Sequence, residues 1–193
     1  EIKKREVYKL GKYGKQFWDG ESGAHRRVMM KAAGYGDADI RNKPHIGVPN
    51  SFQEGSPGTV HLRQIAEAVK QGIWAAGGVP VEFGIPATCG NIPNGVEEMK
   101  YEQVMRDIVC MSVEAVSKVH QFDGICMIAS CDNIIAGCYQ AAARLDIPAM
   151  VVTGGCMSAG SHEGRQVVEA DVDVARFSGK SNEELLELEE CVC

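Results

Sequence analysis

The stretch of residues 123–160 constrains the fold more than any other part of the chain. Its sequence is DGICMIASCDNIIAGCYQAAARLDIPAMVVTGGCMSAG. Apolar runs at 124–129 and 147–153 have the length of buried strands, and residues 138–145 are typical of a helix. A strand, a helix and a second strand in this order form a βαβ unit, whose crossover is almost always right-handed. The stretch therefore predicts two parallel strands joined by a helix.

Polar residues and glycines follow the two apolar runs. Cys131 and Asp132 come just after the first run, and Gly154 and Gly155 come directly after the second. Because open parallel sheets bind ligands outside the carboxyl ends of their strands, we expect a site at this edge. The thiol of Cys131 and the carboxylate of Asp132 should emerge there together, beside glycines that let a ligand approach the backbone. A plain turn is the alternative interpretation of the glycine pair.

The rest of the chain also alternates between strand and helix patterns. Short segments at 45–49 and 79–83 predict two more strands. Further helices are predicted at 24–33, from Ser56-Pro57 to Gly77, at 98–120 and at 183–190, with a polar surface excursion at 158–179. This order predicts an α/β fold with a mostly parallel sheet flanked by helices. We expect an N-terminal arm at 1–43 and one α/β domain at 44–193.

The two longest predicted helices each carry an apolar face. Ser56 is a favoured N-cap residue, and Pro57 suits the first helical position. The apolar positions of this first helix are Leu62, Ile65, Ala66, Val69 and Ile73. Those of the second are Val104, Ile108, Met111 and Ala115. Both faces are expected to cover the sheet.

Charge and hydropathy exclude several classes of partner. The formal net charge is −6, and no long run of Lys or Arg offsets it, which argues against nucleic acid as a partner. No stretch approaches 18 uninterrupted apolar residues, so we expect no membrane span. No apolar signal region follows the basic residues at 3–5. A cytoplasmic protein is the simplest expectation.

Eight cysteines are many for a chain of 193 residues. The chain is too long and too regular for a disulfide-stapled mini-protein, so reduced thiols are expected. Cys110 and Cys126 fall within a predicted helix and strand, where buried thiols are common. The others lie at loops, turns or element ends, where metal binding competes with packing: Cys89, Cys131, Cys138, Cys156, Cys191 and Cys193. None forms a C-x-x-C pair, so spacing alone leaves both interpretations open.

Two long segments resemble a known enzyme family. They are HIGVPNSFQEGSPGTVHLRQIAEAVKQGIWAAGGVPVEF and MKYEQVMRDIVCMSVEAVSKVHQFDGICMIASCDNIIAGCYQAAARLDIPAMVVTGGCM. Both resemble the opening domain of the dihydroxy-acid dehydratase and 6-phosphogluconate dehydratase family, with greater similarity to the dihydroxy-acid branch. The resemblance implies a hydro-lyase that converts a dihydroxy acid to a 2-keto acid, as in branched-chain amino acid biosynthesis. It also implies that the family's C-terminal domain, which carries the catalytic base, lies outside this sequence.

The resemblance implies two cofactors. In the family an iron–sulfur cluster, of the 2Fe–2S or 4Fe–4S type, acts as a Lewis acid on the departing hydroxyl, and Mg²⁺ holds the carboxylate end. Cys131 matches the cluster cysteine of the family's Cys-Asp-Lys motif, and Asp132 matches its magnesium ligand. The sequence ends about where the family reaches its third cluster cysteine, and Cys193 matches a cysteine just before that ligand, with Cys191 as the alternative. No residue is assigned as catalytic.

Several other motif positions depart from the family. The Pro-Cys-Asn motif reads Pro57-Gly58-Thr59, the Ser-Asp-Gly loop reads Thr88-Cys89-Gly90, the motif lysine is Asn133, and two further thiols stand at Cys138 and Cys156. Oxygen ligands are thus lost while thiols are gained, and Cys89 and Asn133 weaken the expectation of Mg²⁺. An all-thiolate site of Cys89, Cys131, Cys138 and Cys156 is one hypothesis.

Three interpretations of function remain open. The chain is a hydro-lyase, or a part or subunit of one, acting on a small dihydroxy acid. In that case it forms a homo- or hetero-oligomer, with a second chain as one source of the missing domain. Alternatively, it is a degenerate, non-catalytic subunit that binds metal or an iron–sulfur cluster at a thiol-rich site, or acts as a scaffold. The third interpretation is that the sequence is incomplete.

Overall fold

The computed structural model describes residues 14–192 of the chain. Residues 1–13 of the predicted arm and the candidate ligand Cys193 lie outside the described residues. The chain divides into two compact units, Glu1–Gly154 and Gly155–Cys193. In the part of the chain that the structure describes, no helix is both long enough and apolar enough to cross a membrane.

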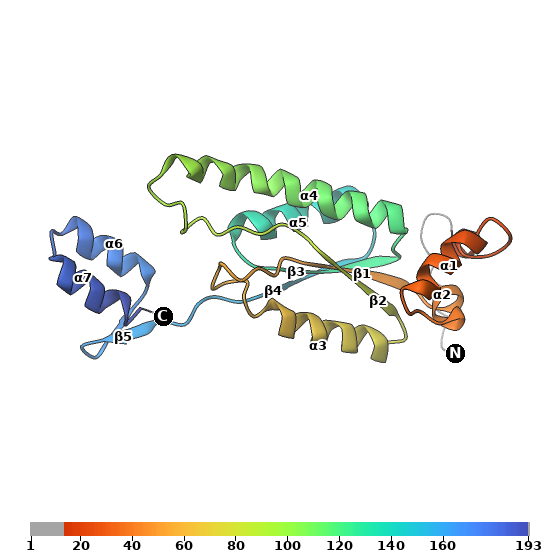
Figure 1. The fold of residues 1–193 in the computed structure, drawn as a ribbon, viewed down its shortest axis with the longest axis horizontal. Coiled ribbons are helices and arrows are strands. Elements are labelled where there is room, and N and C mark those ends of the chain that lie inside the picture. The colour runs from red at the N-terminus through yellow and green to blue at the C-terminus, as the bar shows by residue number, and fades with distance from the viewer. Residues whose placement is uncertain (1–13, 193) are drawn as a thin grey trace, which may run out of the picture. The chain divides into compact units, whose positions relative to one another are not determined.

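The first unit is built on a sheet of four parallel strands (Figure 1). The strands are β1 (His45–Asn50), β2 (Val79–Gly84), β3 (Gly124–Ala129) and β4 (Ala149–Thr153). They lie in the order β2-β1-β3-β4. All four were predicted from their apolar runs, and the α/β fold with a mostly parallel sheet is confirmed.

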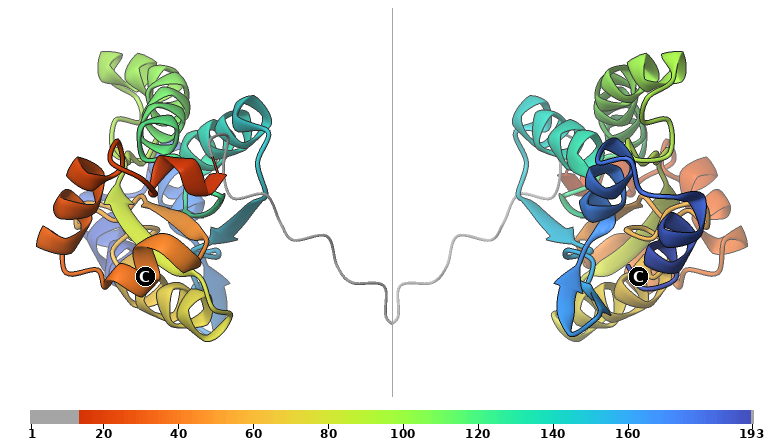
Figure 2. Two further views of the ribbon diagram at one scale, coloured as in Figure 1. Left: turned by 90° about the vertical axis from the view of Figure 1, so that its right-hand side faces the viewer. Right: turned by 90° about the vertical axis from the view of Figure 1, so that its left-hand side faces the viewer.

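Helices cover both faces of this sheet, as Figures 1 and 2 show. Helix α3 (Leu62–Ala75) lies on one face, and α4 (Tyr101–His120) and α5 (Asp132–Leu145) lie on the other. A short 3₁₀ helix, η2 (Glu97–Lys100), leads into α4. Every residue of the central strand β3 is buried, as expected for a parallel strand covered on both sides.

Each face of the sheet has its own apolar core. On the α3 side, the core contains Val48, Leu62, Ala66 and Ile128, with Ile65, Val69 and Ile73 packed against it. The predicted apolar face of this helix is therefore confirmed. On the other side, the core joins β3, α4 and α5 and includes Met127, Val109, Val113, Ile134 and Cys138. Cys110 and Cys126 are both buried, which confirms the prediction that they are packed thiols.

Two helices begin at residues other than the predicted ones. Helix α3 begins at Leu62 and not after Ser56, because residues 56–61 form turns in which Thr59 and Val60 donate to the Ser56 carbonyl. Helix α5 begins at Asp132 and not at Cys138. Gly137, which is unfavourable within a helix, lies in its interior because the backbone of α4 approaches there.

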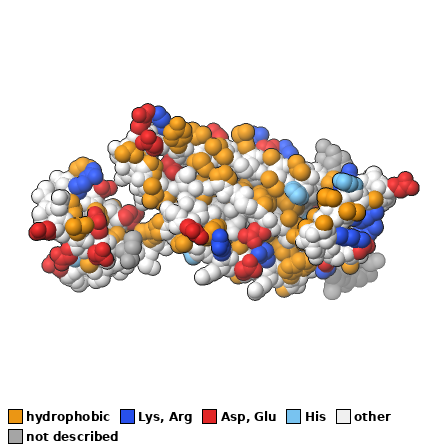
Figure 3. Space-filling view, viewed as in Figure 1, with side chains coloured by type: hydrophobic (Ala, Val, Ile, Leu, Met, Phe, Trp, Pro, Cys, Tyr) orange, Lys and Arg blue, Asp and Glu red, His pale blue; other side chains and the backbone are white. Residues whose placement is uncertain are grey.

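The apolar face predicted for α4 is wrong. Val104, Ile108 and Met111 are 47%, 39% and 64% exposed, and Figure 3 shows hydrophobic side chains gathered over this helix. The buried face consists instead of Glu102, Val109, Cys110, Val113 and Ser117. Apolar residues occur on both sides of α4, and its buried side includes two polar residues. The spacing of apolar residues alone therefore led to the exposed side being predicted as the buried one.

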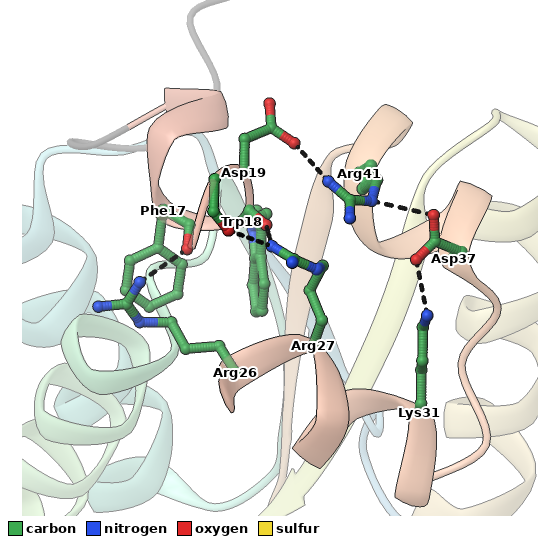
Figure 4. A network of polar contacts seen from close by, with 9 residues as sticks. Phe17, Trp18, Asp19, Arg26, Arg27, Lys31, Asp37 and Arg41 are labelled. Atoms are coloured by element: carbon green, nitrogen blue, oxygen red, sulfur yellow. Dashed lines mark hydrogen bonds and ion pairs between the residues drawn. The ribbon is translucent and has the colours of Figure 1, made fainter. Parts of the chain in front are cut away.

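Short helices precede the sheet: η1 (Gly14–Phe17), α1 (Ala24–Ala32) and α2 (Asp37–Asn42). In α1, the guanidinium of Arg26 donates to the Phe17 carbonyl and that of Arg27 to the Trp18 carbonyl (Figure 4). Both arginines therefore attach α1 to the preceding turn, so their guanidinium groups have a structural role.

The second unit contains a hairpin of β5 (Gly160–His162) and β6 (Arg165–Val167), followed by α6 (Glu169–Phe177) and α7 (Asn182–Glu189). Its small core consists of Val167, Ala175, Leu188 and Val192. The hairpin and α6 occupy most of residues 158–179, the segment predicted as a polar surface excursion. Ser181 caps helix α7, since its hydroxyl accepts from the Glu184 backbone N–H.

Candidate functional site

The segments that follow the strands start together at one edge of the sheet. Backbone hydrogen bonds join each continuation to its neighbour: Ile85 N–H donates to Asn50 O (3.0 Å), Ser51 N–H to Ile128 O (3.0 Å) and Gly154 N–H to Ala129 O (3.2 Å). The loops after all four strands therefore begin at the carboxyl edge, where ligands of open parallel sheets bind. Cys131 and Asp132 lie at this edge, in the segment that follows β3.

Cys131 occupies a strained position at the N-terminus of α5. Its φ of 69° is in the region that residues other than glycine rarely adopt, at a typical cost of roughly 1–3 kcal/mol. The backbone carbonyl of Cys131 already accepts from Ile135 N–H at 3.0 Å, so the strained residue joins β3 directly to the first turn of α5. The side chain is half-buried and packs against the core formed by β3, α4 and α5.

The thiol of Cys89 is close enough to the Cys131 thiol to contribute to the raised pKa of Cys131. Cys89 lies in the loop that follows β2, and both residues are half-buried. Burial, the neighbouring Cys89 thiol and the carboxylates of Asp132 and Glu102 raise the pKa of Cys131 to about 11. Each of these influences disfavours the thiolate, so Cys131 is a protonated thiol at neutral pH in the absence of a cation.

Cys138 lies in a different environment. It is fully buried in the core between α4 and α5, where burial, followed by the nearby Cys110 thiol, raises its pKa to about 12. Cys138 is seven residues further along α5 than Cys131, a rise of about 10 Å along the axis. The structure thus brings Cys89 and Cys131 together and places Cys138 in the packed interior.

Two carboxylates and an amide lie beside the thiol pair. Asp132 is the first residue of α5 and is exposed, and its negative charge suits the helix N-terminus. Asn133, at the position of the family's motif lysine, accepts from Arg106 Nη2 at 2.9 Å and donates to Glu102 Oε2 at 3.4 Å. Asn133 therefore connects α4 to α5, and its side chain is used structurally.

The first glycine after β4 makes a close backbone contact. The Gly154 carbonyl accepts from His61 Nε2 at 2.9 Å. A Cβ on Gly154 would lie 3.0 Å from Gly58 O and 3.0 Å from Leu62 Cδ2. The loop before α3 and the first residue of that helix therefore leave room only for glycine at position 154. Gly155 has a φ of +87°, which also favours glycine. The predicted close approach at this glycine pair is therefore to the chain's own backbone.

Two other candidate ligands belong to the second unit. Cys156 is exposed, and Cys191 is half-buried and packs against the small core of that unit.

Three hydroxyls at the carboxyl edge were not among the predicted site residues. Ser51 Oγ, Ser56 Oγ and Thr88 Oγ1 are buried and have no hydrogen-bond partner within the described part of the chain. The first two lie in the segment after β1 and the third lies beside Cys89. Because an unmade hydrogen bond on a buried hydroxyl is costly, this edge of the sheet has polar groups available for a bound molecule. Their positions after strand ends were the signal that could have found them.

The described residues do not fit the two cofactors implied for the family as a complete site. Across residues 14–192 there is no group of three or more His, Cys, Asp or Glu side chains placed to bind a metal ion. The first unit brings together two thiols, whereas an iron–sulfur cluster is held by more cysteines. Mg²⁺ prefers oxygen ligands, and Cys89 presents sulfur to the site. We therefore derive no catalytic step through either group.

The fold and the site together define an α/β domain whose parallel sheet carries a cysteine–aspartate pair at its carboxyl edge. Residues 43–193 match the family model described as dihydroxy-acid/6-phosphogluconate dehydratase N-terminal. The chain is 44% identical over 174 residues to a dihydroxy-acid dehydratase of Methanobrevibacter smithii, which covers 88% of the chain. It is 43% identical over 178 residues to that of Methanococcus aeolicus, which covers 90% of the chain.

The chain therefore belongs to the dihydroxy-acid/6-phosphogluconate dehydratase family. A dihydroxy-acid dehydratase of Methanothermobacter thermautotrophicus is likewise similar, with 44% identity over 174 residues. The matched segment is 32% of the length of each of these three relatives, so the chain spans about a third of the proteins it resembles.

Proposed function

We propose that this chain is the N-terminal part of a hydro-lyase that removes water from a 2,3-dihydroxy acid to give a 2-keto acid. The observation that supports this most is the position of Cys131 and Asp132 at the carboxyl end of β3, in a chain of the dehydratase family. The buried hydroxyls of Ser51, Ser56 and Thr88, which have no hydrogen-bond partner among residues 14–192, also support binding of an oxygen-rich small molecule near this edge.

In this proposal the chain contributes some, but not all, of the ligands of the active site. Cys131 would supply one thiolate to an iron–sulfur cluster, which serves such enzymes as a Lewis acid toward the leaving hydroxyl. Asp132 would supply an oxygen to Mg²⁺. The remaining ligands and the catalytic base would come from the portion of the relatives that this chain does not span, either within a longer polypeptide or on a partner chain of a homo- or hetero-oligomer. A cytoplasmic location belongs to the same proposal.

The thiolate role of Cys131 is compatible with its environment only when a cation is bound. Burial and the neighbouring carboxylates hold the free thiol protonated, whereas a metal cation favours the thiolate strongly enough to reverse this preference. The strained backbone of Cys131 supports the same interpretation. Backbone strain is concentrated at functional sites, where it holds a side chain in the orientation that its function requires.

The test is an assay of 2-keto acid release from 2,3-dihydroxy-3-methylbutanoate, under anaerobic conditions, by the chain alone and by the chain mixed with a C-terminal segment from a relative. We expect release only in the mixture, together with bound iron and sulfide. Cys131→Ser should abolish release and iron binding, while the matched variant Cys126→Ala, on the preceding strand, should keep both. Iron-free protein and no release in any mixture would contradict the proposal.

A second candidate function is favoured by one specific observation. Cys89, which replaces an oxygen ligand of the family, lies close enough to Cys131 to raise its pKa, so the site has changed from mixed sulfur and oxygen toward sulfur. A non-catalytic subunit with a thiol-rich metal or cluster site would show this change. In the same experiment, such a subunit would bind iron or zinc, and this binding would require both Cys89 and Cys131. It would release no keto acid in any mixture.

A further inference from the structure

We propose that the exposed face of α4 is the contact surface of a symmetric dimer. In this dimer, α4 of one copy packs antiparallel against α4 of a second copy of this chain. The proposal concerns the first unit alone and does not depend on a catalytic role of the chain.

The exposed side of α4 carries a continuous apolar stripe, in the region where Figure 3 shows hydrophobic side chains over this helix. Tyr101, Val104, Ile108 and Met111 are 61%, 47%, 39% and 64% exposed, and Ala115 is also exposed. These residues follow one another at spacings of three, four, three and four positions along the helix. This alternation places them on one side of α4, and it is the spacing of the seam through which two helices pack as a coiled coil.

Packing within the first unit does not use the stripe. Val109 and Val113, on the opposite side of α4, are fully buried and belong to the core that joins β3, α4 and α5. The outer side of a helix that covers a sheet is ordinarily polar, so a second apolar side indicates a second contact. The exposed parts of the five stripe residues amount to roughly 450 Å², in the range at which an apolar patch marks an interaction surface.

The area of the stripe is sufficient for a weak dimer. Two stripes in contact remove roughly 900 Å² from water, and the side chains beside them bring the interface to the area of about 1,000 Å² that a specific contact needs. Interfaces of this size are at the low end of the specific class, so the dimer should dissociate on dilution.

The stripe is complementary to itself when the second helix runs in the opposite direction. Reversing an alternation of three and four residues gives the same alternation, so a twofold axis near the middle of the stripe aligns the two copies over its whole length. Ile108 then lies opposite Met111 of the second copy, and Val104 lies opposite Ala115, which pairs a larger side chain with a smaller one. Twofold dimers that use the same surface on both copies are the commonest oligomers, which favours a second copy as the partner.

The charges beside the stripe also suit this arrangement. Asp107 is exposed on one flank, and Glu114 lies on the same flank seven residues further on. Glu114 forms ion pairs with Lys118 and Arg144, so this cluster carries one net positive charge. The antiparallel arrangement brings Asp107 of each copy beside the cluster of the other, where the charges have opposite sign. Lys118 also approaches Tyr101 of the second copy, whose ring attracts its ammonium group.

Sedimentation equilibrium of the whole 193-residue chain, with a reducing agent to prevent disulfides between copies, tests the proposal. We expect the mass of two chains at high protein concentration and the mass of one chain after dilution. Ile108→Lys and Met111→Glu should each raise the dissociation constant of the dimer at least about tenfold, because each places a charge against an apolar side chain. Val28→Glu, at a 56% exposed position of α1, is the matched control and should leave the dissociation constant unchanged. Far-UV circular dichroism verifies that each variant is folded.

An equimolar mixture of the Ile108→Lys and Met111→Glu chains tests the antiparallel register. In the mixed dimer the introduced lysine faces the introduced glutamate, while the unchanged Met111 and Ile108 face each other. We therefore expect the mixture to recover the dimer, with one chain of each kind detected by native mass spectrometry. A parallel arrangement would not place the two introduced charges opposite each other and would give no recovery.

A folded wild-type chain that stays monomeric at every concentration, or a dimer that neither substitution weakens, would overturn the proposal. Dissociation by both substitutions without recovery in the mixture would overturn the antiparallel register. A monomeric chain that binds the C-terminal segment of a relative through Ile108 and Met111 would also overturn the proposal, by assigning this face to the rest of a longer protein. These measurements need neither iron, sulfide nor substrate, so their outcome is separate from that of the keto acid assay.

Discussion

Gly137→Ala tests the contact between α4 and α5, which positions the N-terminus of α5 and hence Cys131. A Cβ at residue 137 would lie 2.6 Å from the Arg106 carbonyl oxygen and 2.9 Å and 3.0 Å from Val109 Cβ and Cγ1. Ordinary contacts of a Cβ begin near 3.4 Å. The two helices would have to separate by several tenths of an ångström, and two of the three obstructing atoms belong to backbone or to a Cβ that cannot rotate away.

The expected cost follows from two opposing effects. Overpacking a core by one methyl group typically costs about 1–3 kcal/mol. Alanine is favoured over glycine within a helix by about 1 kcal/mol, which offsets part of that cost. We therefore expect Gly137→Ala to lower the free energy of unfolding by up to about 2 kcal/mol, measured by urea denaturation followed by far-UV circular dichroism.

Gly72→Ala is the matched control. Gly72 is also inside a helix, α3, but nothing lies within 4 Å of the position its Cβ would take. This substitution should keep the helical gain alone and raise the free energy of unfolding by up to about 1 kcal/mol. A Gly137→Ala chain as stable as Gly72→Ala would refute the close packing of α4 on α5.

Two further predictions concern α4 and the buried thiols. Val113→Ala, which empties a fully buried position, should cost about 2 kcal/mol in urea denaturation, while Val119→Ala, 72% exposed, should stay within about 0.5 kcal/mol; equal losses would contradict the assigned faces of α4. Burial raises the pKa of Cys138 from 9.0 to about 12, so above pH 9 the unfolded chain loses a proton that the folded chain keeps. Stability should therefore fall as the pH rises from 9 to 11, by up to about 1.4 kcal/mol per pH unit from this thiol. Cys138→Ala should show a shallower fall, and an unchanged slope would show that Cys138 is not buried as described.

The sheet could be predicted because each of its strands coincides with a short, mostly apolar run in the sequence. The 124–129 and 147–153 runs contain the whole of β3 and β4, and the parallel pairing of these strands places their carboxyl ends at a common edge. The same runs predicted that Cys131 and Asp132 would lie at that edge. The helix boundaries were harder, because Gly137 is unfavourable in an isolated helix and is explained only by the approach of Arg106 and Val109.

The proximity of Cys89 and Cys131 could not be predicted from the sequence. The two residues follow strands that are not neighbours in the sheet, because β1 lies between β2 and β3. Their proximity depends on the path of the loop from β2, which is fixed by Gln53 and by the packing of Gly90 on α4. Neither interaction has a signature in residue spacing. In the same way, the burial of Cys138 follows from where α5 begins, which the sequence pattern placed too late.

Cross-linking with dibromobimane, which joins only thiols that lie close together, tests most directly whether the loops after β2 and β3 bring two sulfur atoms into one site. The reduced Cys126→Ala chain should give a fluorescent product that joins the peptide containing Cys89 to the peptide containing Cys131, and Cys89→Ser in that background should abolish it. A chain that is folded by circular dichroism but gives no such product would contradict a shared site for Cys89 and Cys131.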